Sequence, residues 1–321
     1  MDAFSDLLRG VRAHGSLFGS TTLTPPWSLH FVDGAPLSLC TVVRGGGWIV
    51  PEREPPVRLG VHDTVLVRGP GTFAFVDEVG TAAVPVECGV ECAVPELGGT
   101  RHRLGWYEPD GGDGATVFVV GAYPVRGEIS RRLLEALPVV LRVDAGGALD
   151  PVLGHLADEI AVDAPGQQIV LDRLLDWMLV TTLREFFDRP GGRAPAWWAA
   201  QHDPVAGTAL QLLHGEPAAP WTVAALARRA GVSRATLAKR FSDLVGEPPL
   251  TYLTGWRMTL AADLLLDRPG ATVAEVARAV GYVDPFGFST AFKRVRGVSP
   301  SEFRRAGAAT ATGVTAGTAR P

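Results

Sequence analysis

The 321-residue sequence predicts an α+β chain of two domains, an N-terminal β-barrel with following helices and a C-terminal all-α domain. Three observations lead to this prediction. Short apolar runs separated by Gly, Pro and Asp fill the first part of the chain, which is typical of strands joined by turns. Two longer stretches with helical spacing of apolar residues follow. The last third then repeats one helical pattern, and the length is sufficient for two domains.

The barrel is predicted from strand-like segments, which are Leu37–Val43, Trp48–Val50, Thr64–Val67, Thr72–Val76 and Thr116–Val120. Strands this short and regularly interrupted are typical of a small barrel. Aromatic side chains in this region are candidates either for the core or for lining an effector pocket, and they are Trp48, Phe73, Phe75, Trp106 and Tyr107.

Two helices are predicted after the barrel, at Asp150–Val162 and Gln167–Phe187. The apolar stripe of the second is wide enough to pack on its own barrel and on a symmetry mate. We expect Leu175, Met178 and Leu179 at such a two-fold interface. The composition then divides the chain into four parts: residues 1–189 as a domain formed by the barrel and the two helices, 190–202 as a linker, 203–306 as an all-α domain, and 307–321 as a disordered tail. The family resemblance described below implies that the first of these parts is a sensor and dimerisation domain.

The all-α domain contains an internal repeat. TVAALARRAG begins at Thr222 and TVAEVARAVG at Thr272, and later positions recur in the same order, with Phe241, Gly246, Pro249 and Tyr252 matched by Phe292, Gly297, Pro300 and Phe303. Two short amphipathic helices around a small residue, the second helix basic, predict a helix-turn-helix in each copy. A connecting helix is predicted at Leu250–Leu266, and its length is roughly 25 Å. With the radii of the flanking units added, this helix can hold two recognition helices about one DNA turn apart, roughly 34 Å.

Charge separates the two halves of the chain. Residues 217–306 carry 13 Lys and Arg against 7 Asp and Glu, whereas residues 1–216 carry 16 against 27. A basic tail on an acidic front half is typical of a sensor joined to a DNA-binding domain. The sequence has no apolar run long enough to span a membrane and no signal layout at its start. We therefore expect a cytoplasmic protein, and three cysteines are consistent with a reducing compartment.

The repeated region resembles the AraC/XylS family of bacterial transcription regulators. The residues that carry the resemblance are the two TVAxΦAR starts, Ser233, Leu237, Phe241, Arg257-Met258, Gly281-Tyr282, Phe292-Lys293 and Gly297 through Arg304. The resemblance implies recognition helices at Ser233–Leu244 and Asp284–Val295. It places bases opposite Arg234, Ala235, Ala238 and Lys239 in the first helix and opposite Pro285, Phe286, Ser289 and Thr290 in the second.

These residue types suggest how bases and phosphates are contacted. Arg234 is the main candidate for bidentate contact with guanine, and Lys239 reaches either a guanine or a phosphate. Ala235 and Ala238 suit thymine methyl groups, whereas the second helix is expected to contribute mainly position and shape readout. Four further cations are predicted to contact phosphates in preference to forming a solvated face, and they are Arg240, Lys293, Arg294 and Arg296.

The first part of the chain resembles the cupin sensor found in one branch of that family, over roughly residues 2–200. The segments that carry this resemblance are CTVVRGGGWIV, PPVRLGVHDTVLVRGPGTFAFVDE, LLEALPVVLRV and PAWWAAQHDPVAGTAL. A metal-loaded cupin has two histidines and a glutamate early and another histidine later. Here His30, His62 and His102 are scattered and Arg44–Gly47 occupies the first motif. We expect no metal and no cofactor, and a barrel that holds a small effector or nothing.

The cysteines permit two interpretations. Cys88 and Cys92 are close enough in sequence to share a strand face, so an oxidation-triggered bridge is one of them. Glu87 and Glu91 flank the pair, and negative charge disfavours the reactive thiolate. We favour a structural role for both cysteines. Cys40 stands alone in an expected strand.

The sequence thus predicts a non-enzymatic, sequence-specific DNA-binding transcription regulator. The resemblance implies double-stranded DNA and RNA polymerase as partners, an unidentified small-molecule effector or stress signal, and a homodimer formed by the helices after the barrel. Two rivals stay open at this point: a cupin enzyme fused to a DNA-binding domain, and a constitutive DNA-binding protein with a vestigial barrel. The effector, the operator and the choice between activation and repression are not encoded in any motif.

Overall fold

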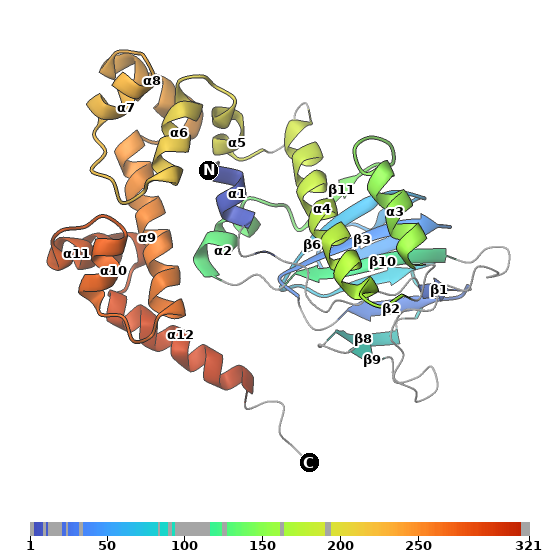
Figure 1. Ribbon diagram of the computed structural model, residues 1–321. Helices are drawn as coiled ribbons and strands as arrows, with labels where there is room; N and C mark the ends of the chain where they lie inside the picture. The colour runs from blue at the N-terminus through green and yellow to red at the C-terminus, as the bar shows by residue number, and fades with distance from the viewer. Residues whose placement is uncertain are drawn as a thin grey trace. The chain divides into compact units, whose positions relative to one another are not determined.

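The computed structural model describes residues 3–8, 11, 21–23, 25–31, 35–82, 84–88, 92–93, 116–123, 127–160, 164–189 and 194–315. The chain forms two compact units (Figure 1). The sheet unit consists of Val11–Val125 and Leu134–Arg193, and the helical unit consists of Met1–Gly10, Arg126–Leu133 and Ala194–Pro321.

The sheet unit is built from two sheets. The strands are β1 (Thr21–Leu23), β2 (Ser28–Phe31), β3 (Leu37–Arg44), β4 (Gly47–Pro51), β5 (Val57–Leu59), β6 (Thr64–Arg68), β7 (Phe73–Val76), β8 (Val84–Cys88), β9 (Cys92–Ala93), β10 (Thr116–Tyr123) and β11 (Val140–Val143). Their order is β1-β10-β3-β6-β11 in one sheet and β5-β4-β7-β2-β8-β9 in the other. Among the described strands, all pairs are antiparallel except β2 with β8. The cupin-like sheet domain expected from the sequence is confirmed.

The core of this unit lies between the two sheets. The five-stranded sheet contributes Cys40, Val42, Val65, Val67, Phe118 and Val120, and the six-stranded sheet contributes Leu29, Phe31, Ile49, Leu59, Phe73 and Phe75. The central strand β3 is buried at six consecutive positions, because its other face is covered as well. Two-sided burial explains why its sequence is a continuous apolar run instead of an alternating one.

Helices α3 (Asp150–Ile160) and α4 (Gln167–Asp188) follow the last strand and pack against each other in the sheet unit (Figure 1). A Cβ on Gly121 of β10 would meet Leu175 Cδ1 at 2.5 Å, and Tyr123 Oη donates to Leu175 O at 2.8 Å. The side chains of Leu175, Met178 and Leu179 are fully buried within the protomer. Our placement of these three residues at a two-fold interface was therefore wrong. The apolar stripe predicted correctly that α4 has a buried face, but the sheet of the same chain covers it.

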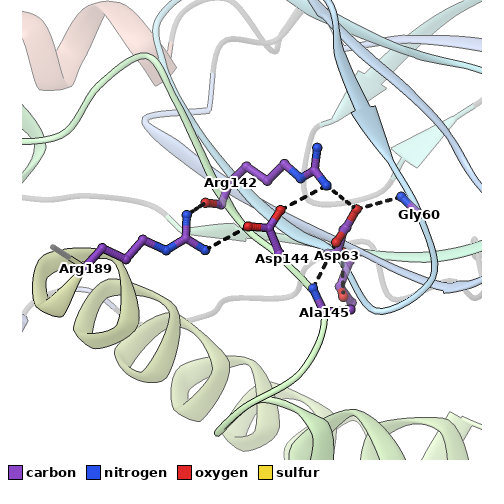
Figure 2. A network of polar contacts seen from close by, with 7 residues as sticks. Gly60, Asp63, Arg142, Asp144, Ala145 and Arg189 are labelled. Atoms are coloured by element: carbon purple, nitrogen blue, oxygen red, sulfur yellow. Dashed lines mark hydrogen bonds and ion pairs between the residues drawn. The ribbon is translucent and has the colours of Figure 1, made fainter. Parts of the chain in front are cut away.

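A polar network joins the turn before β6 to the segment after β11 (Figure 2). Buried Asp63 accepts from Gly60 N at 2.7 Å, Ala145 N at 3.0 Å and Arg142 Nη2 at 3.0 Å. Arg189, which caps the C-terminus of α4, donates to Arg142 O at 2.9 Å and lies 3.4 Å from Asp144. The end of α4, from which the chain leaves for the helical unit, is thus held on the sheet unit by two fixed acceptors.

The helical unit is built from ten helical segments among the described residues. They are α1 (Ala3–Leu8), the first part of α2 (Gly127–Glu135), α5 (Ala196–Gln201), α6 (Ala206–Gly215), α7 (Val223–Arg229), α8 (Arg234–Val245), α9 (Pro249–Asp267), α10 (Val273–Ala279), α11 (Pro285–Arg296) and α12 (Pro300–Thr315). Two cores lie along α9. One is centred on Leu237, Phe241 and Leu253, and the other on Phe288 and Phe292.

The observed division of the chain differs from the expected one in two places. The border between the units at Arg193 and Ala194 falls inside the expected linker, residues 190–202, but α1 and residues 126–133 also belong to the helical unit. The expected disordered tail, residues 307–321, is helical as far as Thr315. This segment continues α12, which begins at Pro300.

Candidate nucleic-acid interface

The first helix-turn-helix consists of α7 and α8. Thr222 Oγ1 accepts from Ala225 N at 3.1 Å and caps α7. Gly231 turns the chain with φ 69°, a conformation that favours glycine. Ser233 then caps α8 by accepting from Thr236 N at 3.1 Å. Leu237 and Phe241 bury the inner face of α8, so the opposite face points to solvent.

The second helix-turn-helix, α10 and α11, repeats this construction. Thr272 and Glu275 form a reciprocal capping box on α10, and hydrogen bonds from the Thr272 backbone and side chain lower the pKa of Glu275. Gly281 makes the turn with φ 85°. Asp284 caps α11 by accepting from Phe286 N at 3.0 Å and Gly287 N at 2.8 Å.

Helix α9 holds the two halves together. Arg257 donates to Pro217 O and Ala219 O, both at 2.7 Å, and its guanidinium lies 5.7 Å from the centre of the Tyr282 ring. These contacts connect the loop before the first helix-turn-helix to the turn of the second. Arg304 holds the loop before the second one in the same way, by donating to Ala271 O at 2.7 Å. The two recognition helices therefore have a defined relative position within the helical unit.

The first recognition helix presents its expected base-facing residues to solvent. Arg234, Ala235 and Lys239 are exposed, and Ala238 is half-buried. Lys239 Nζ lies 2.6 Å from Asp243 Oδ2, with 79% of the lysine side chain exposed. Exposed pairs of this kind contribute little to stability, so Lys239 is readily available to another anion.

Arg240 has a second role that the sequence did not suggest. Its Nε and Nη2 atoms both lie 2.7 Å from Asp203 Oδ2, and Asp203 Oδ1 accepts from Val205 N and Ala206 N at the start of α6. Burial disfavours the charged form of Asp203, but these hydrogen bonds outweigh it and lower its pKa. Arg240 thus fixes α8 to α6, although half of its side chain is still exposed.

The second recognition helix presents an apolar tip. Phe286 is 85% exposed, and Val283, which the sequence analysis did not single out, is 96% exposed just before the helix. The Ser289 and Thr290 hydroxyls donate back to Pro285 O at 2.9 Å and Phe286 O at 3.0 Å. The hydroxyl protons of this face are therefore engaged within α11, and the protruding groups are apolar. An apolar residue in a turn of an otherwise polar surface was the sequence signal for Val283.

The cations of α11 divide into two kinds. Lys293 and Arg294 are exposed in its last turn. Arg296 is only 20% exposed, with Nη1 at 2.7 Å from Glu128 Oε2 and Nη2 at 3.1 Å from Thr259 Oγ1. Unlike Lys293 and Arg294, Arg296 is therefore engaged within the helical unit. Helical spacing alone did not reveal that it borders the buried face of α11, where α9 and α2 lie.

Comparison with known proteins agrees with this architecture. A cupin family matches residues 2–188, and a helix-turn-helix domain family matches residues 226–306. The chain is 33% identical over 311 residues to a putative AraC-like transcription regulator of Streptomyces lividans, covering 95% of this chain and 98% of the relative. The chain belongs to the AraC-like transcription regulators.

Two further similarities were found. The HTH-type transcriptional regulator AlkR of Acinetobacter baylyi is 30% identical over 319 residues, covering 95% of this chain and 99% of the relative. Among solved structures, the DNA-binding domain of AdpA in complex with a target DNA is 35% identical, with a TM-score of 0.30, covering 32% of this chain and 92% of that domain. The two family matches and the full-length relatives show that this AraC-like regulator is a DNA-binding protein with a cupin-like domain.

A buried polar triad in the helical unit of the regulator escaped the sequence analysis. His214 Nδ1 lies 2.9 Å from Asp6 Oδ2, and His214 Nε2 lies 2.7 Å from Tyr252 Oη. Burial raises the pKa of Tyr252 to about 12, so its phenol stays protonated. The triad ties α1, α6 and α9 together. Residues this far apart in sequence show no common motif, which is why they were missed.

The proposed effector-lining residues of the regulator are only partly described. Phe73 stacks on Phe31 at 4.7 Å, and Phe75 packs edge-on against Phe118 at 4.4 Å. Both side chains therefore pack in the core of the sheet unit, which is one of the two alternatives that the sequence left open. Trp48 is half-buried on β4, whereas Trp106 and Tyr107 lie outside the described residues, as does His102.

Among the residues that the structure describes, no three His, Cys, Asp or Glu side chains gather as a metal site. Over the same residues, no helix is long and apolar enough to cross a membrane.

The cysteines of the regulator differ in their surroundings. Cys40 is a free thiol in the core, and burial raises its pKa well above the ordinary value. Such a thiol is unreactive because the thiolate is the nucleophile. Cys88 and Cys92 are paired in the backbone register of β8 with β9, and their side chains lie outside the described part of the chain.

Proposed function

We propose that α8 and α11 enter successive major grooves of an operator. The observation that carries this proposal is the pair of capped helix-turn-helix units fixed on one helix, α9, each with an outward face. In the first helix, exposed Arg234 contacts a guanine, Lys239 a guanine or phosphate, and Ala235 and Ala238 contact thymine methyl groups. Removing Arg234 is expected to relax the preference at one base pair and to cost about 1–3 kcal/mol.

The second helix reads DNA through apolar contact. Phe286 is presented beside Val283, and the hydroxyls of Ser289 and Thr290 are already bonded within the helix. Thymine is the only base with a methyl group in the major groove. We assign Phe286 and Val283 to thymine methyl groups, with Pro285 and the two hydroxyl residues shaping the contact surface.

Deoxyuridine tests this assignment because it removes one methyl group and keeps every hydrogen bond. An operator is first selected from a random library. Replacing one contacted thymine in the α11 half-site should then weaken binding by about 0.8 kcal/mol, about fourfold. At a thymine that Phe286 contacts, the Phe286→Ala variant should bind both DNAs equally. Deoxyuridine in the α8 half-site is the matched control, because it removes a methyl group assigned to α8 and should weaken wild type and variant alike. Equal sensitivity of wild type and Phe286→Ala would refute the assignment.

Phosphates are the second class of contact. Lys293 and Arg294 are exposed in the last turn of α11, and Arg240 retains an exposed half. Each phosphate contact releases about 0.9 counterion. Lys293→Gln should therefore weaken all sequences alike and reduce the salt slope of log K by about 0.9. An unchanged slope would exclude this residue from the interface.

We also propose that the sheet unit senses a small effector and that RNA polymerase is the protein partner on DNA. The relatives are named as transcription regulators, which supports a sensor over an enzyme. A ligand at about 100 times its Kd stabilises the unit that it binds by about 2.7 kcal/mol. Thermal unfolding of the full chain against a metabolite library should reveal a compound that shifts the sheet unit. No shift from any compound, together with unchanged operator binding, would favour the vestigial barrel.

The outer face of α4 is our proposed dimer contact. Ile169, Val170 and Trp177 are exposed there, although they are large apolar residues on one side of the helix. A second copy of α4 related by a two-fold axis would cover this self-complementary face. Trp177→Glu should produce a folded monomer in sedimentation velocity, and Val79→Glu, at an exposed apolar site elsewhere in the sheet unit, should not. A Trp177→Glu protein that sediments as wild type would rule this face out.

A further inference from the structure

Part of α2 belongs to the helical unit, although it lies between two strands of the sheet unit in the sequence. The chain leaves β10 at Tyr123, forms α2, and re-enters the sheet at β11. Residues 126–133 nevertheless cluster with the DNA-binding helices. The end of β10 at Tyr123 and the start of α2 at Gly127 are therefore close in sequence, although they belong to different units.

Asp263 of α9 holds the start of α2. Its carboxylate accepts from Glu128 N, and from Ile129 N at 3.2 Å. Burial raises the pKa of Asp263, and these two hydrogen bonds oppose the shift. Gly127 has φ 87°, and a Cβ there would approach the Asp263 carboxylate to 2.8 Å. Both the φ value and the close approach require glycine.

Glu128 links α2 to the second recognition helix. Its side chain is 7% exposed, with Oε2 at 2.7 Å from Arg296 Nη1 and Oε1 at 2.8 Å from Arg131 Nη1. Arg296 Nη2 also donates a hydrogen bond to Thr259 Oγ1 of α9. The pair is largely removed from solvent, so Arg296 is not free to contact another anion while Glu128 is in place.

The next turn of α2 reaches the first half of the DNA-binding unit. The Arg132 guanidinium lies 5.3 Å from the centre of the Tyr252 ring, within the range of a cation–π contact. Tyr252 belongs to the core under α8 and is bonded to His214. Through Arg132 and Glu128, α2 therefore contacts both halves of the DNA-binding unit.

We propose that residues 127–132 form a clasp that masks Arg296, and that displacement of the clasp frees Arg296 to bind a DNA phosphate beside Lys293 and Arg294. The proposal rests on the proposed contact of α11 with DNA. The clasp lowers affinity in two ways: it occupies one cation and it places the Glu128 carboxylate next to the recognition helix. A signal in the sheet unit that moves α2 then raises operator affinity.

The magnitude follows from one additional phosphate contact. Such a contact changes the slope of log K against log salt by about 0.9. If it contributes nothing at about 1 M salt, it multiplies affinity about fivefold at about 0.15 M. The effect is thus measurable and dependent on salt, which distinguishes it from a change in folding.

The test measures operator binding by full-length Glu128→Gln across a salt series. We expect binding about fivefold tighter than wild type at about 0.15 M salt and a slope steeper by about 0.9. The double variant Glu128→Gln/Arg296→Gln should lose the gain that comes from the Arg296 contact and bind more weakly than Glu128→Gln. Glu135→Gln is the matched control, because it removes an exposed charge of the same helix. Unchanged or weaker binding by Glu128→Gln, or the same gain in Glu135→Gln, overturns the proposal.

Two further measurements separate the clasp from the DNA contact and from folding defects. Asp263→Asn leaves Glu128 intact but weakens the start of α2, and it too should tighten binding. In wild type, the amides of Glu128 and Ile129 should exchange faster with operator than without; slower or equal exchange counts against release. If Lys293→Gln weakens binding while Glu128→Gln has no effect, only the clasp fails. If neither variant has an effect, the proposed contact of α11 fails as well.

Discussion

Asp203 is expected to stabilise the DNA-binding unit through two separable interactions. Oδ1 caps α6 by accepting from Val205 N at 2.9 Å and Ala206 N at 2.8 Å, and loss of an N-cap costs about 1 kcal/mol. Oδ2 binds Arg240 at 2.7 Å. That arginine is half exposed, so solvent screening limits the pair to about 0.5–1 kcal/mol. Asp203→Ala should therefore cost about 2 kcal/mol.

Asp203→Asn separates the two contributions. The asparagine oxygen keeps the cap, because Asn is as good an N-cap as Asp, whereas its amide group cannot accept from Arg240. We expect a loss of about 0.5–1 kcal/mol for this variant. The larger loss in Asp203→Ala corresponds to about thirtyfold faster amide exchange in α6 and α8, against about two- to fivefold for Asp203→Asn. Exchange in the intact chain is the suitable assay, because two units do not unfold as one transition.

The lowered pKa of Asp203 adds a dependence on pH. A carboxylate with a depressed folded-state pKa contributes stability above its unfolded value, about 3.9, and that stability is lost as pH falls through the folded pKa. Protection of α6 and α8 in wild type should therefore decline below about pH 4, and this component should be absent in Asp203→Asn. Equal exchange of the Ala and Asn variants at neutral pH would refute the assignment of the cap to Oδ1.

Three further outcomes follow from the structure. Gly281→Ala should lower the melting temperature of the DNA-binding unit more than Gly246→Ala. Both glycines have positive φ, but only at Gly281 would a Cβ meet a neighbouring backbone carbonyl. Equal shifts in melting temperature would exclude the steric contribution. Tyr123→Phe leaves the buried Leu175 carbonyl without its phenol donor and should cost about 1–3 kcal/mol in thermal unfolding of the sheet unit, with a neutral result contradicting the bond. Cys40 should resist alkylation in the native chain and react on unfolding, as measured by mass spectrometry. Rapid labelling of the native chain would show instead that the thiol is accessible. Mild peroxide should leave operator affinity unchanged.

The sequence predicted the DNA-binding unit well because that unit is specified by local rules. The caps Thr222, Ser233 and Thr272 act within three residues of the amides that they bind, and Gly231 and Gly281 have the positive φ that their turns require. Apolar residues at helical spacing, such as Phe241 and Phe292, are buried. Each of these features depends on neighbours along the chain, so the residue pattern contains the information.

Contacts between distant segments could not be predicted in the same way. The helical spacing of Leu175 is compatible with an interface residue and with a core residue alike. Its side chain is buried against Gly121 of β10, so Leu175 belongs to the core. Phe75 is as suitable for a pocket wall as for the centre of a sandwich, and contacts with Trp27 and Phe118 decided for the latter. Burial of this kind depends on which elements meet in space, and periodicity gives only the face of each element.

By itself, the sequence determined the tandem helix-turn-helix, the two recognition helices and the separation of an acidic cupin-like region from a basic DNA-binding region. Only the tertiary structure decided that Asp203 holds Arg240, that His214 joins Asp6 to Tyr252, and that Glu128 masks Arg296. The physical reason is sequence separation. A cap or a turn is completed within a few residues. These charged and polar pairs, in contrast, form only after burial of apolar surface has brought distant segments of the chain together. Glu128 and Arg296, for example, are 168 residues apart in the sequence.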